Sequence, residues 1–250
     1  MYYTPNHNQI IKEECFMKPL HAYPHPERPQ NPSPLEMAIY NYELKAKEFH
    51  NKRIAQKGPT SEELKNKMAR DFNHLQKEKE RITAHARLQT DLKEYRELSA
   101  SSTVTQLKQE KHHPTQKLAR HLAAIGEPKP TKLHEANHII CGTGQYQSAN
   151  MLQTRLNLHL HGVGINDPIN GVWLINFEKN KEQNWDSPAS PPHRKLHRYN
   201  YETWINTNFD NAATPKALFL NRLRTVKVKI KTGTVPAGLL EPKNENWKAL

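Results

Sequence analysis

The sequence is poor in the residues that build cross-linked or membrane-embedded proteins. Its 250 residues include two cysteines, Cys15 and Cys141, which lie far apart and in no metal-ligand spacing. This argues against a disulfide framework and suits a reducing compartment. No stretch approaches the roughly 20 apolar residues that a membrane-spanning helix needs. Residues 1–16 also lack the basic n-region and the apolar h-region of a secretory signal. We therefore expect that the protein does not associate with a membrane. We also expect that it is made in the cytoplasm without a signal peptide.

Positive charge, by contrast, is abundant. The chain carries a formal net charge of +12, with fifteen histidines counted as neutral, and a sequence pI of about 9.6. Such a balance favours binding to polyanions such as nucleic acid or anionic lipid. It is equally compatible with lysines that are merely solvated, so the charge alone selects no function.

The first third of the chain reads as an extended arm followed by helices. Residues 1–34 form the arm, and proline recurs every few residues in 19–34, which blocks regular helix and inner strand. Ser33, Pro34 and Glu36 then form the pattern of a capping box with a first-turn proline, and an apolar stripe follows at spacings of three and four. We predict a mostly helical region over 35–112.

A short break divides this helical region in two. Gly58 and Pro59 interrupt the periodic pattern, and Thr60 with Glu63 offers a second capping box. Two amphipathic helices joined in this way predict an αα-hairpin or coiled-coil arm. The arm is interpreted either as a docking or delivery module or as simple packing against the rest of the protein.

The chain beyond this arm changes character. Residues 99–103 read as a loop, and a short helix is expected after Pro114, with Gly126 just past its end. We place the next domain at 113–225. In the basic tail 226–250, lysines alternate with Val228 and Ile230, which predicts a possible strand that could serve as a phosphate track or as a lysine-protected edge.

Three segments in this domain carry candidate chemistry. The first, 134–140, brings His138 to the start of an apolar run, and the second, 164–175, is a turn rich in Asn, Asp, Pro and Gly that leads into an apolar strand. The third contains His193 and His197, four residues apart. On a helix that spacing puts both imidazoles on one face, close enough to share a divalent ion. In a histidine-rich chain the pair alone is weak evidence, and the ordered combination strengthens it.

The ordered series resembles a known nuclease family. Residues 115–205 are similar to the AHH family of HNH (ββα-metal) nucleases, which occur as toxin domains of bacterial polymorphic toxins. The resemblance covers the short helix at 117–125, the segment 136–140, the segment 160–174 with its Asn-Gly turn, and His193-x-x-x-His197. It implies an α+β fold with a C-terminal ββα-metal nuclease core and surrounding helices, preceded by the mostly helical N-terminal region.

The resemblance also implies roles for individual residues. His138 would act as general base, and Asn170 would position it through the loop backbone. One divalent metal ion, with Mg²⁺ or Zn²⁺ favoured among Mg, Mn, Zn and Ni, would be held by His193, His197 and Asn137. The basic side chains that flank the histidine pair would clamp substrate phosphates or form an ordinary solvated face; these are Arg194, Lys195 and Arg198.

Asn137 departs from the family pattern, which has the first of two adjacent histidines at this position. An amide oxygen can still bind a hard cation, so the ion site can persist with an altered metal preference. The alternatives are a weakened site, or a contribution from His134 or Glu135 instead.

The resemblance and the charge together predict function and partners. The expected activity is metal-dependent endonucleolytic cleavage, of DNA before RNA and with little sequence specificity, by an antibacterial toxin. Such a toxin would need a dedicated secretion system, a carrier reached through the helical arm, and an acidic immunity protein, and it would act in the cytoplasm of a target cell. The alternatives are a non-toxic HNH endonuclease of housekeeping or phage type, and a non-catalytic metal- or nucleic-acid-binding protein.

Overall fold

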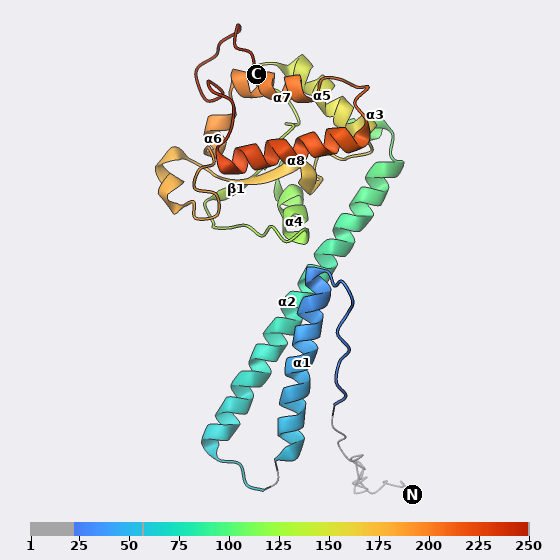
Figure 1. Ribbon diagram of the computed structural model, residues 1–250, viewed down its shortest axis with the longest axis vertical. Coiled ribbons are helices and arrows are strands. Elements are labelled where there is room, and N and C mark those ends of the chain that lie inside the picture. The colour runs from blue at the N-terminus through green and yellow to red at the C-terminus, as the bar shows by residue number, and fades with distance from the viewer. Residues whose placement is uncertain (1–22, 57, 250) are drawn as a thin grey trace, which may run out of the picture. The chain divides into compact units, whose positions relative to one another are not determined.

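The computed structural model describes residues 23–56 and 58–249, and the chain divides into two compact units, 1–82 and 83–250 (Figure 1). None of the described helices combines the length and the apolar character that crossing a bilayer requires. Cys15 and the predicted arm up to residue 22 lie outside the described residues, and 23–32 form no helix or strand. The elements are α1 (Pro34–Ala55), α2 (Glu62–Ser101), α3 (Val104–Lys108), α4 (Gln116–Ala124), β1 (His134–His138), α5 (Ser148–Leu160), η1 (Pro168–Asn170), β2 (Gly171–Ile175), η2 (Glu178–Gln183), α6 (His193–Leu196), α7 (Tyr199–Phe209) and α8 (Lys216–Thr232).

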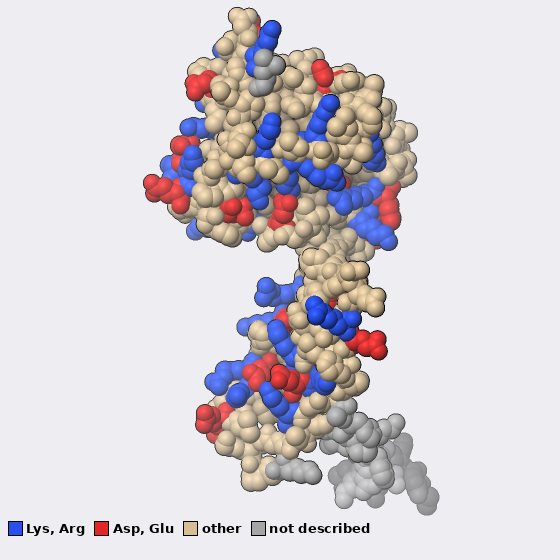
Figure 2. Space-filling model, in the orientation of Figure 1, with Lys and Arg blue, Asp and Glu red and all other residues tan. Residues whose placement is uncertain are grey.

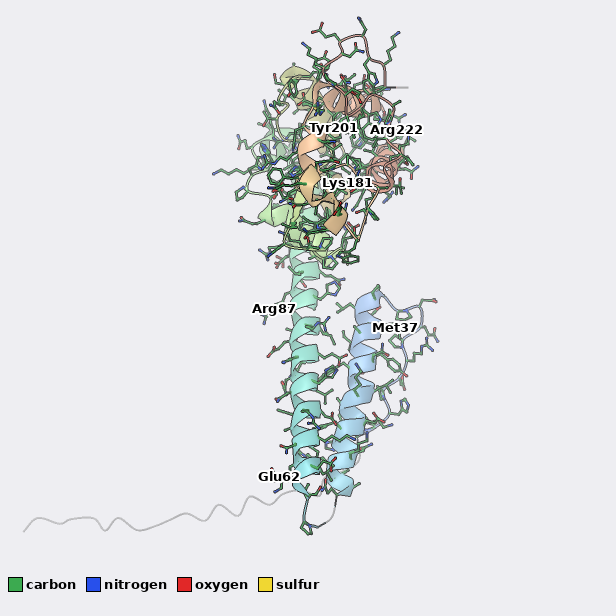
Figure 3. All side chains as sticks on the ribbon, turned by 90° about the vertical axis from the view of Figure 1, so that its left-hand side faces the viewer. Met37, Glu62, Arg87, Lys181, Tyr201 and Arg222 are labelled. Carbon is green, nitrogen blue, oxygen red and sulfur yellow. The ribbon has the colours of Figure 1, made fainter. Side chains whose placement is uncertain are left out.

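The first unit is a helical hairpin. Helix α1 and the first half of α2 run side by side, and the break at Gly58 separates them in the sequence (Figures 1 and 3). The capping box of Ser33 and Glu36 begins α1 as predicted. The second helix begins differently, because Ser61 rather than Thr60 accepts the first-turn N–H of Leu64 over 3.3 Å. No residue of α1 is buried, so this hairpin has little core of its own.

The two helices of the hairpin are joined by scattered contacts. Lys45 donates to Glu78 over 2.8 Å, and the rings of Phe49 and Phe72 lie 6.1 Å apart. Phe72 remains 47% exposed. An exposed ion pair contributes at most about 1 kcal/mol, so apolar contacts of this kind must supply most of the pairing energy.

The second unit is α+β, with a two-stranded antiparallel sheet of β1 and β2. His134 pairs with Ile175 and His138 with Gly171. Helix α4 packs against the β1–β2 pair so closely that a Cβ on Gly171 would lie 2.7 Å from Leu118 Cδ1. The main core gathers side chains from β2, α5, α7 and α8. The sheet thereby places His138 at the end of strand β1.

Two predictions about secondary structure are wrong. The loop was expected at 99–103, but residues 99–101 belong to α2, which ends at Ser101. The expected strand in the basic tail is part of helix α8, whose Phe219, Leu223, Val226 and Ile230 recur at helical spacing and are buried. Val228 is 58% exposed, although a strand would place it on the same face as Ile230.

The helix also corrects the predicted domain boundary. Because α8 spans 216–232, a boundary between 225 and 226 would divide a single helix. Val226, Ile230 and Leu239 belong to the same core as the strands. The C-terminal residues are therefore part of the second unit rather than a separate tail.

Candidate active site

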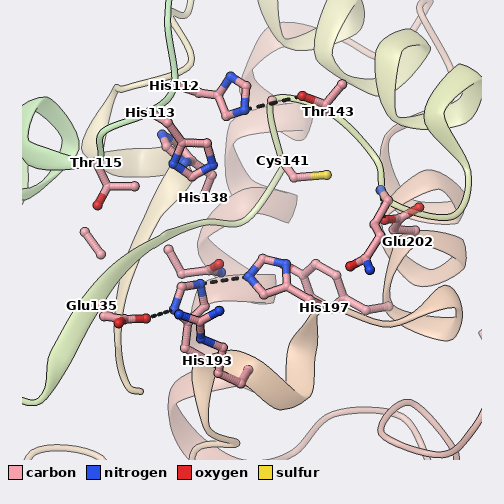
Figure 4. Close-up of a pocket in the computed structure, with 16 residues that line it drawn as sticks. His112, His113, Thr115, Glu135, His138, Cys141, Thr143, His193, His197 and Glu202 are labelled. Atoms are coloured by element: carbon pink, nitrogen blue, oxygen red, sulfur yellow. Dashed lines mark hydrogen bonds and ion pairs between the residues drawn. The ribbon is translucent and has the colours of Figure 1, made fainter. Parts of the chain in front are cut away.

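A cleft of about 510 Å³ opens beside β1 in the second unit. Asn137 and His138 line it from the strand, and His193, Arg194 and His197 line it from the turn of α6 (Figure 4). The fold thus brings together residues separated by more than fifty positions in the sequence. Of the predicted site residues, Asn170, Lys195 and Arg198 are not among the lining side chains.

His138 is held as a neutral imidazole with a defined tautomer. It is 6% exposed, and burial lowers its pKa to about 4, with His112 and His113 acting in the same direction. Its Nε2 lies 3.0 Å from Asn166 Oδ1. Because that amide oxygen only accepts, Nε2 carries the proton and Nδ1 keeps its lone pair. A base of this form can take a proton from water at neutral pH.

Asn166 fixes this arrangement and was missed in the sequence. Its Nδ2 donates to Glu110 Oε1 over 2.9 Å and to the carbonyl of Lys111 over 3.0 Å. Both donors are therefore directed away from His138, and the oxygen must face the imidazole. Asn166 lies in the Asn-Asp-Pro turn four residues before Asn170, but nothing local distinguishes it from an ordinary turn residue.

Asn170 braces the chain that follows His138. Its Oδ1 accepts from the N–H of Ile140 over 2.8 Å, and its Nδ2 donates to the carbonyls of Ile140 and Ile165. Its own carbonyl accepts from the N–H of Ile139 over 2.8 Å. These contacts run through loop backbone, as expected, and the positioning role itself stays a prediction.

His193 and His197 face each other across the single turn of α6. Their Nε2 atoms lie 2.8 Å apart, and His193 Nδ1 donates to Glu135. A carboxylate on Nδ1 gives His193 the tautomer with its lone pair on Nε2, as in histidines that bind metals. In this structure that lone pair accepts from His197 Nε2–H, so an ion held by both Nε2 atoms would replace this hydrogen bond and move the His197 proton to Nδ1. Burial lowers the pKa of both imidazoles, in the case of His197 to about 4, with His193 and Arg194 adding to the shift. Both rings are therefore neutral at pH 7, the form in which an imidazole can bind a metal.

The third predicted ligand, Asn137, lies in the same cleft. It is 4% exposed, and its Nδ2 has no hydrogen-bond partner among the described residues. Within 23–56 and 58–249, no three His, Cys, Asp or Glu side chains form a group that could hold a metal. Two imidazole nitrogens and the side-chain oxygen of Asn137, rather than this Nδ2, would fit a single divalent cation with open coordination positions.

The alternative ligands are placed differently. His134 is fully buried and does not line the cleft, and its two ring nitrogens contact Thr131 and Asn184. It is therefore excluded as a ligand. Glu135 lines the cleft but contacts His193, so it would orient that imidazole rather than serve as a ligand itself.

The three flanking cations do not act alike. Arg194 lines the cleft, and its guanidinium lies 5.4 Å from the centre of the Phe177 ring. Lys195 instead pairs with Glu178 over 2.9 Å. Arg198 has a buried Nε without a partner among the described residues and does not line the cleft. A phosphate clamp is thus supported for Arg194, and the geometry does not support it for the other two.

The positioning network reaches back to α2, which yields a first prediction. The hydroxyl of Tyr95 donates to Glu110 Oε2 over 2.9 Å and accepts from the N–H of Asn166 over 3.0 Å. In Tyr95→Phe both buried partners lose a hydrogen bond, so we expect the free energy of unfolding to fall by about 1–3 kcal/mol. Urea unfolding followed by circular dichroism measures this loss.

The matched control is Tyr146→Phe. Tyr146 is 49% exposed, and a surface substitution of this kind should change the free energy of unfolding by no more than about 0.5 kcal/mol. Equal stability of the Tyr95→Phe protein and the wild type would contradict the assigned network.

Comparison with known proteins agrees with this geometry. Residues 118–216 match the sequence profile of AHH, a nuclease family of the HNH/ENDO VII superfamily with conserved AHH. The matched segment begins in α4 and ends at the start of α8. Searches of curated proteins and of solved structures found no match for the chain.

Proposed function

Because residues 118–216 carry a nuclease domain of the AHH family, we propose that this protein is a metal-dependent endonuclease that cleaves DNA with little sequence specificity and acts as an antibacterial toxin. The observation that carries the proposal is the neutral His138, with a free Nδ1, in one cleft with the paired Nε2 atoms of His193 and His197. A base beside a metal site is what phosphodiester hydrolysis requires.

The residues divide the reaction between them. His138 Nδ1 takes the proton of the attacking water, whose oxygen bonds to phosphorus while the bond from phosphorus to the 3′-oxygen breaks. Asn166 holds the ring in its tautomer, and Asn170 holds the loop behind it. His193, His197 and Asn137 would hold one divalent ion, Mg²⁺ or Zn²⁺. When bound, such an ion supplies Lewis-acid stabilisation of the charge on the phosphate and leaving oxygen.

Charge supports a nucleic-acid substrate. The formal net charge is +12, and Lys and Arg side chains follow α8 on the face seen in Figure 2. Lys216, Arg224 and Lys229 on this helix are exposed. Lys227 and Lys231 pair with Glu127 and Asp186, so of the three alternating lysines only Lys229 has no ion pair among the described residues. Contacts of this kind grip the backbone and carry little sequence information.

The toxin role is supported by the family and the arm. The hairpin of α1 and α2 has almost no core of its own, which suits a surface for a carrier or a secretion machine. We propose export by a dedicated secretion system, action in the cytoplasm of the target cell, and neutralisation by an acidic immunity protein that matches the basic charge.

Plasmid nicking tests the enzymatic proposal. Purified protein is incubated with supercoiled DNA and, in parallel, with RNA, in the presence of Mg²⁺, Mn²⁺, Zn²⁺ or Ni²⁺ and with or without EDTA. Open circles and linear DNA should appear with metal and disappear with the chelator. Cleavage that continues in the presence of the chelator, or no cleavage with any metal, would contradict the proposal. The second result would favour a non-catalytic binding protein.

Expression in a bacterial cytoplasm tests the biological role. We expect growth arrest with degraded DNA, both absent when His138 is replaced by alanine. Tolerated expression of a protein that is active in the nicking assay would instead identify a non-toxic endonuclease.

A further inference from the structure

Two histidines that precede the family segment form a second wall of the cleft. His112 and His113 lie between α3 and α4 and line the cleft together with His138. Their ring centres lie 6.2 Å and 6.4 Å from that of His138, at interplanar angles of 77° and 89°. In Figure 4 they are on the side of His138, opposite the pair His193 and His197. The matched family segment begins at residue 118, so this wall is an addition to it.

The loop that carries these histidines is anchored by a buried arginine. Arg155 on α5 is 5% exposed, and its Nη2 donates to the carbonyls of Lys108 and Glu110 over 2.9 Å and 2.8 Å. Its Nη1 donates to the carbonyl of Gly142 over 3.1 Å. One side chain therefore ties the loop to the segment that follows β1.

Gly142 adds a steric condition to this anchoring. A Cβ at that position would lie 2.1 Å from Cγ of His112. The His112 ring thus packs directly against glycine backbone, with its Nε2 also 3.4 Å from Thr143 Oγ1. The close fit fixes the place of His112 and, through the chain, that of its neighbour.

His113 has the geometry of a ligand-binding side chain. It is exposed at the mouth of the cleft, and it makes ring contacts but no hydrogen bond among the described residues. Because its ring stands perpendicular to that of His138, no parallel slot is left between them for a base to stack. What remains available is a ring N–H, a donor suited to a phosphate oxygen.

We propose that His113, held in place by His112, binds a non-bridging oxygen of the substrate's backbone phosphate at or next to the bond that is cut. Arg194 lines the same cleft, so the phosphate would be contacted by donors from two separate segments. This inference rests on the proposed nuclease function, and it adds a substrate contact that the family segment does not contain.

Binding to DNA without metal tests the inference apart from cleavage. The probe is a fluorescent DNA duplex of about two helical turns, with an RNA duplex in parallel, titrated with full-length protein in EDTA and followed by anisotropy. We expect His113→Ala to weaken binding roughly tenfold. His113→Gln retains an N–H donor and should recover part of the affinity. His74→Ala, an exposed histidine on α2 far along the chain, is the matched control and should bind as the wild type does.

Methylphosphonate substitution tests whether His113 contacts a phosphate. Because binding has little sequence specificity, neutral methylphosphonates are placed at every other position of both strands, and the loss of affinity should be roughly tenfold larger for the wild type than for the His113→Ala protein. Equal losses for the two proteins would overturn the assignment, as would equal affinity of His113→Ala and wild type for the unmodified duplex. If the wild type nicks DNA but gives one of these two contradicting results, only the inference is refuted. If the wild type nicks no DNA with any metal, the proposed function is refuted. If it binds neither duplex, both are refuted.

Discussion

Replacing His138 by alanine should slow plasmid nicking by about a thousandfold or more, within the range ascribed to loss of a positioned general base. Asn166 Oδ1 occupies Nε2, which leaves Nδ1 as the basic nitrogen of the neutral imidazole. Alanine removes the only described histidine that the strand β1 sends into the cleft. Initial rates on supercoiled DNA at saturating metal measure the loss.

His134→Gln is the matched control for this prediction. His134 lies on the same strand and is fully buried, but it contacts Thr131 and Asn184 rather than the cleft. Its substitution should lower the melting temperature and leave the specific activity of the folded fraction close to that of wild type. Circular dichroism shows whether each variant is folded. A folded His138→Ala protein with full cleavage would rule out the assigned base.

The parts of the fold that were predictable from the sequence depend on local signals. The capping box at Ser33 is satisfied within four residues of chain, and the helix end at Gly126 needs only a positive φ, here 86°. The strand at 171–175 followed from the apolar run after the Asn-Gly turn. Strand β1 contains a single apolar residue, and its pairing with β2 defines it. In α8 the alternation of lysines with Val228 and Ile230 indicated a strand, whereas apolar residues at spacings of three and four indicated a helix. The helix forms because it buries Phe219, Leu223, Val226 and Ile230.

The parts of the site that could not be predicted depend on contacts distant in sequence. His138 and Asn166 are 28 positions apart, and Tyr95 is 71 positions from Asn166. Side-chain hydrogen bonds of this kind leave no periodicity or spacing in the chain. The loop with His113 was overlooked for the same reason, since only Arg155 and Gly142 bring it to the cleft.

The separation of the base from the metal pair suggests that the two can be disabled independently. His193→Ala and His197→Ala each remove one of the two converging imidazoles, so cleavage should fall about a thousandfold because the charge-stabilising ion is lost. Unlike His138→Ala, both variants should also lose metal binding. Titration with Co²⁺, whose visible absorption reports its ligands, distinguishes the two kinds of defect without any cleavage assay.

Glu135→Gln gives an intermediate step in the same series. Its carboxylate contacts Nδ1 of His193 rather than the cation site itself, and partners of this kind typically change metal affinity about 10- to 100-fold. Lys195→Ala is the matched control on the same turn, because Lys195 pairs with Glu178, and it should bind Co²⁺ as the wild type does. If His193→Ala and His197→Ala bound Co²⁺ with unchanged affinity, the ion would have to be held elsewhere, and the assignment of Asn137 as its third ligand would fall with them.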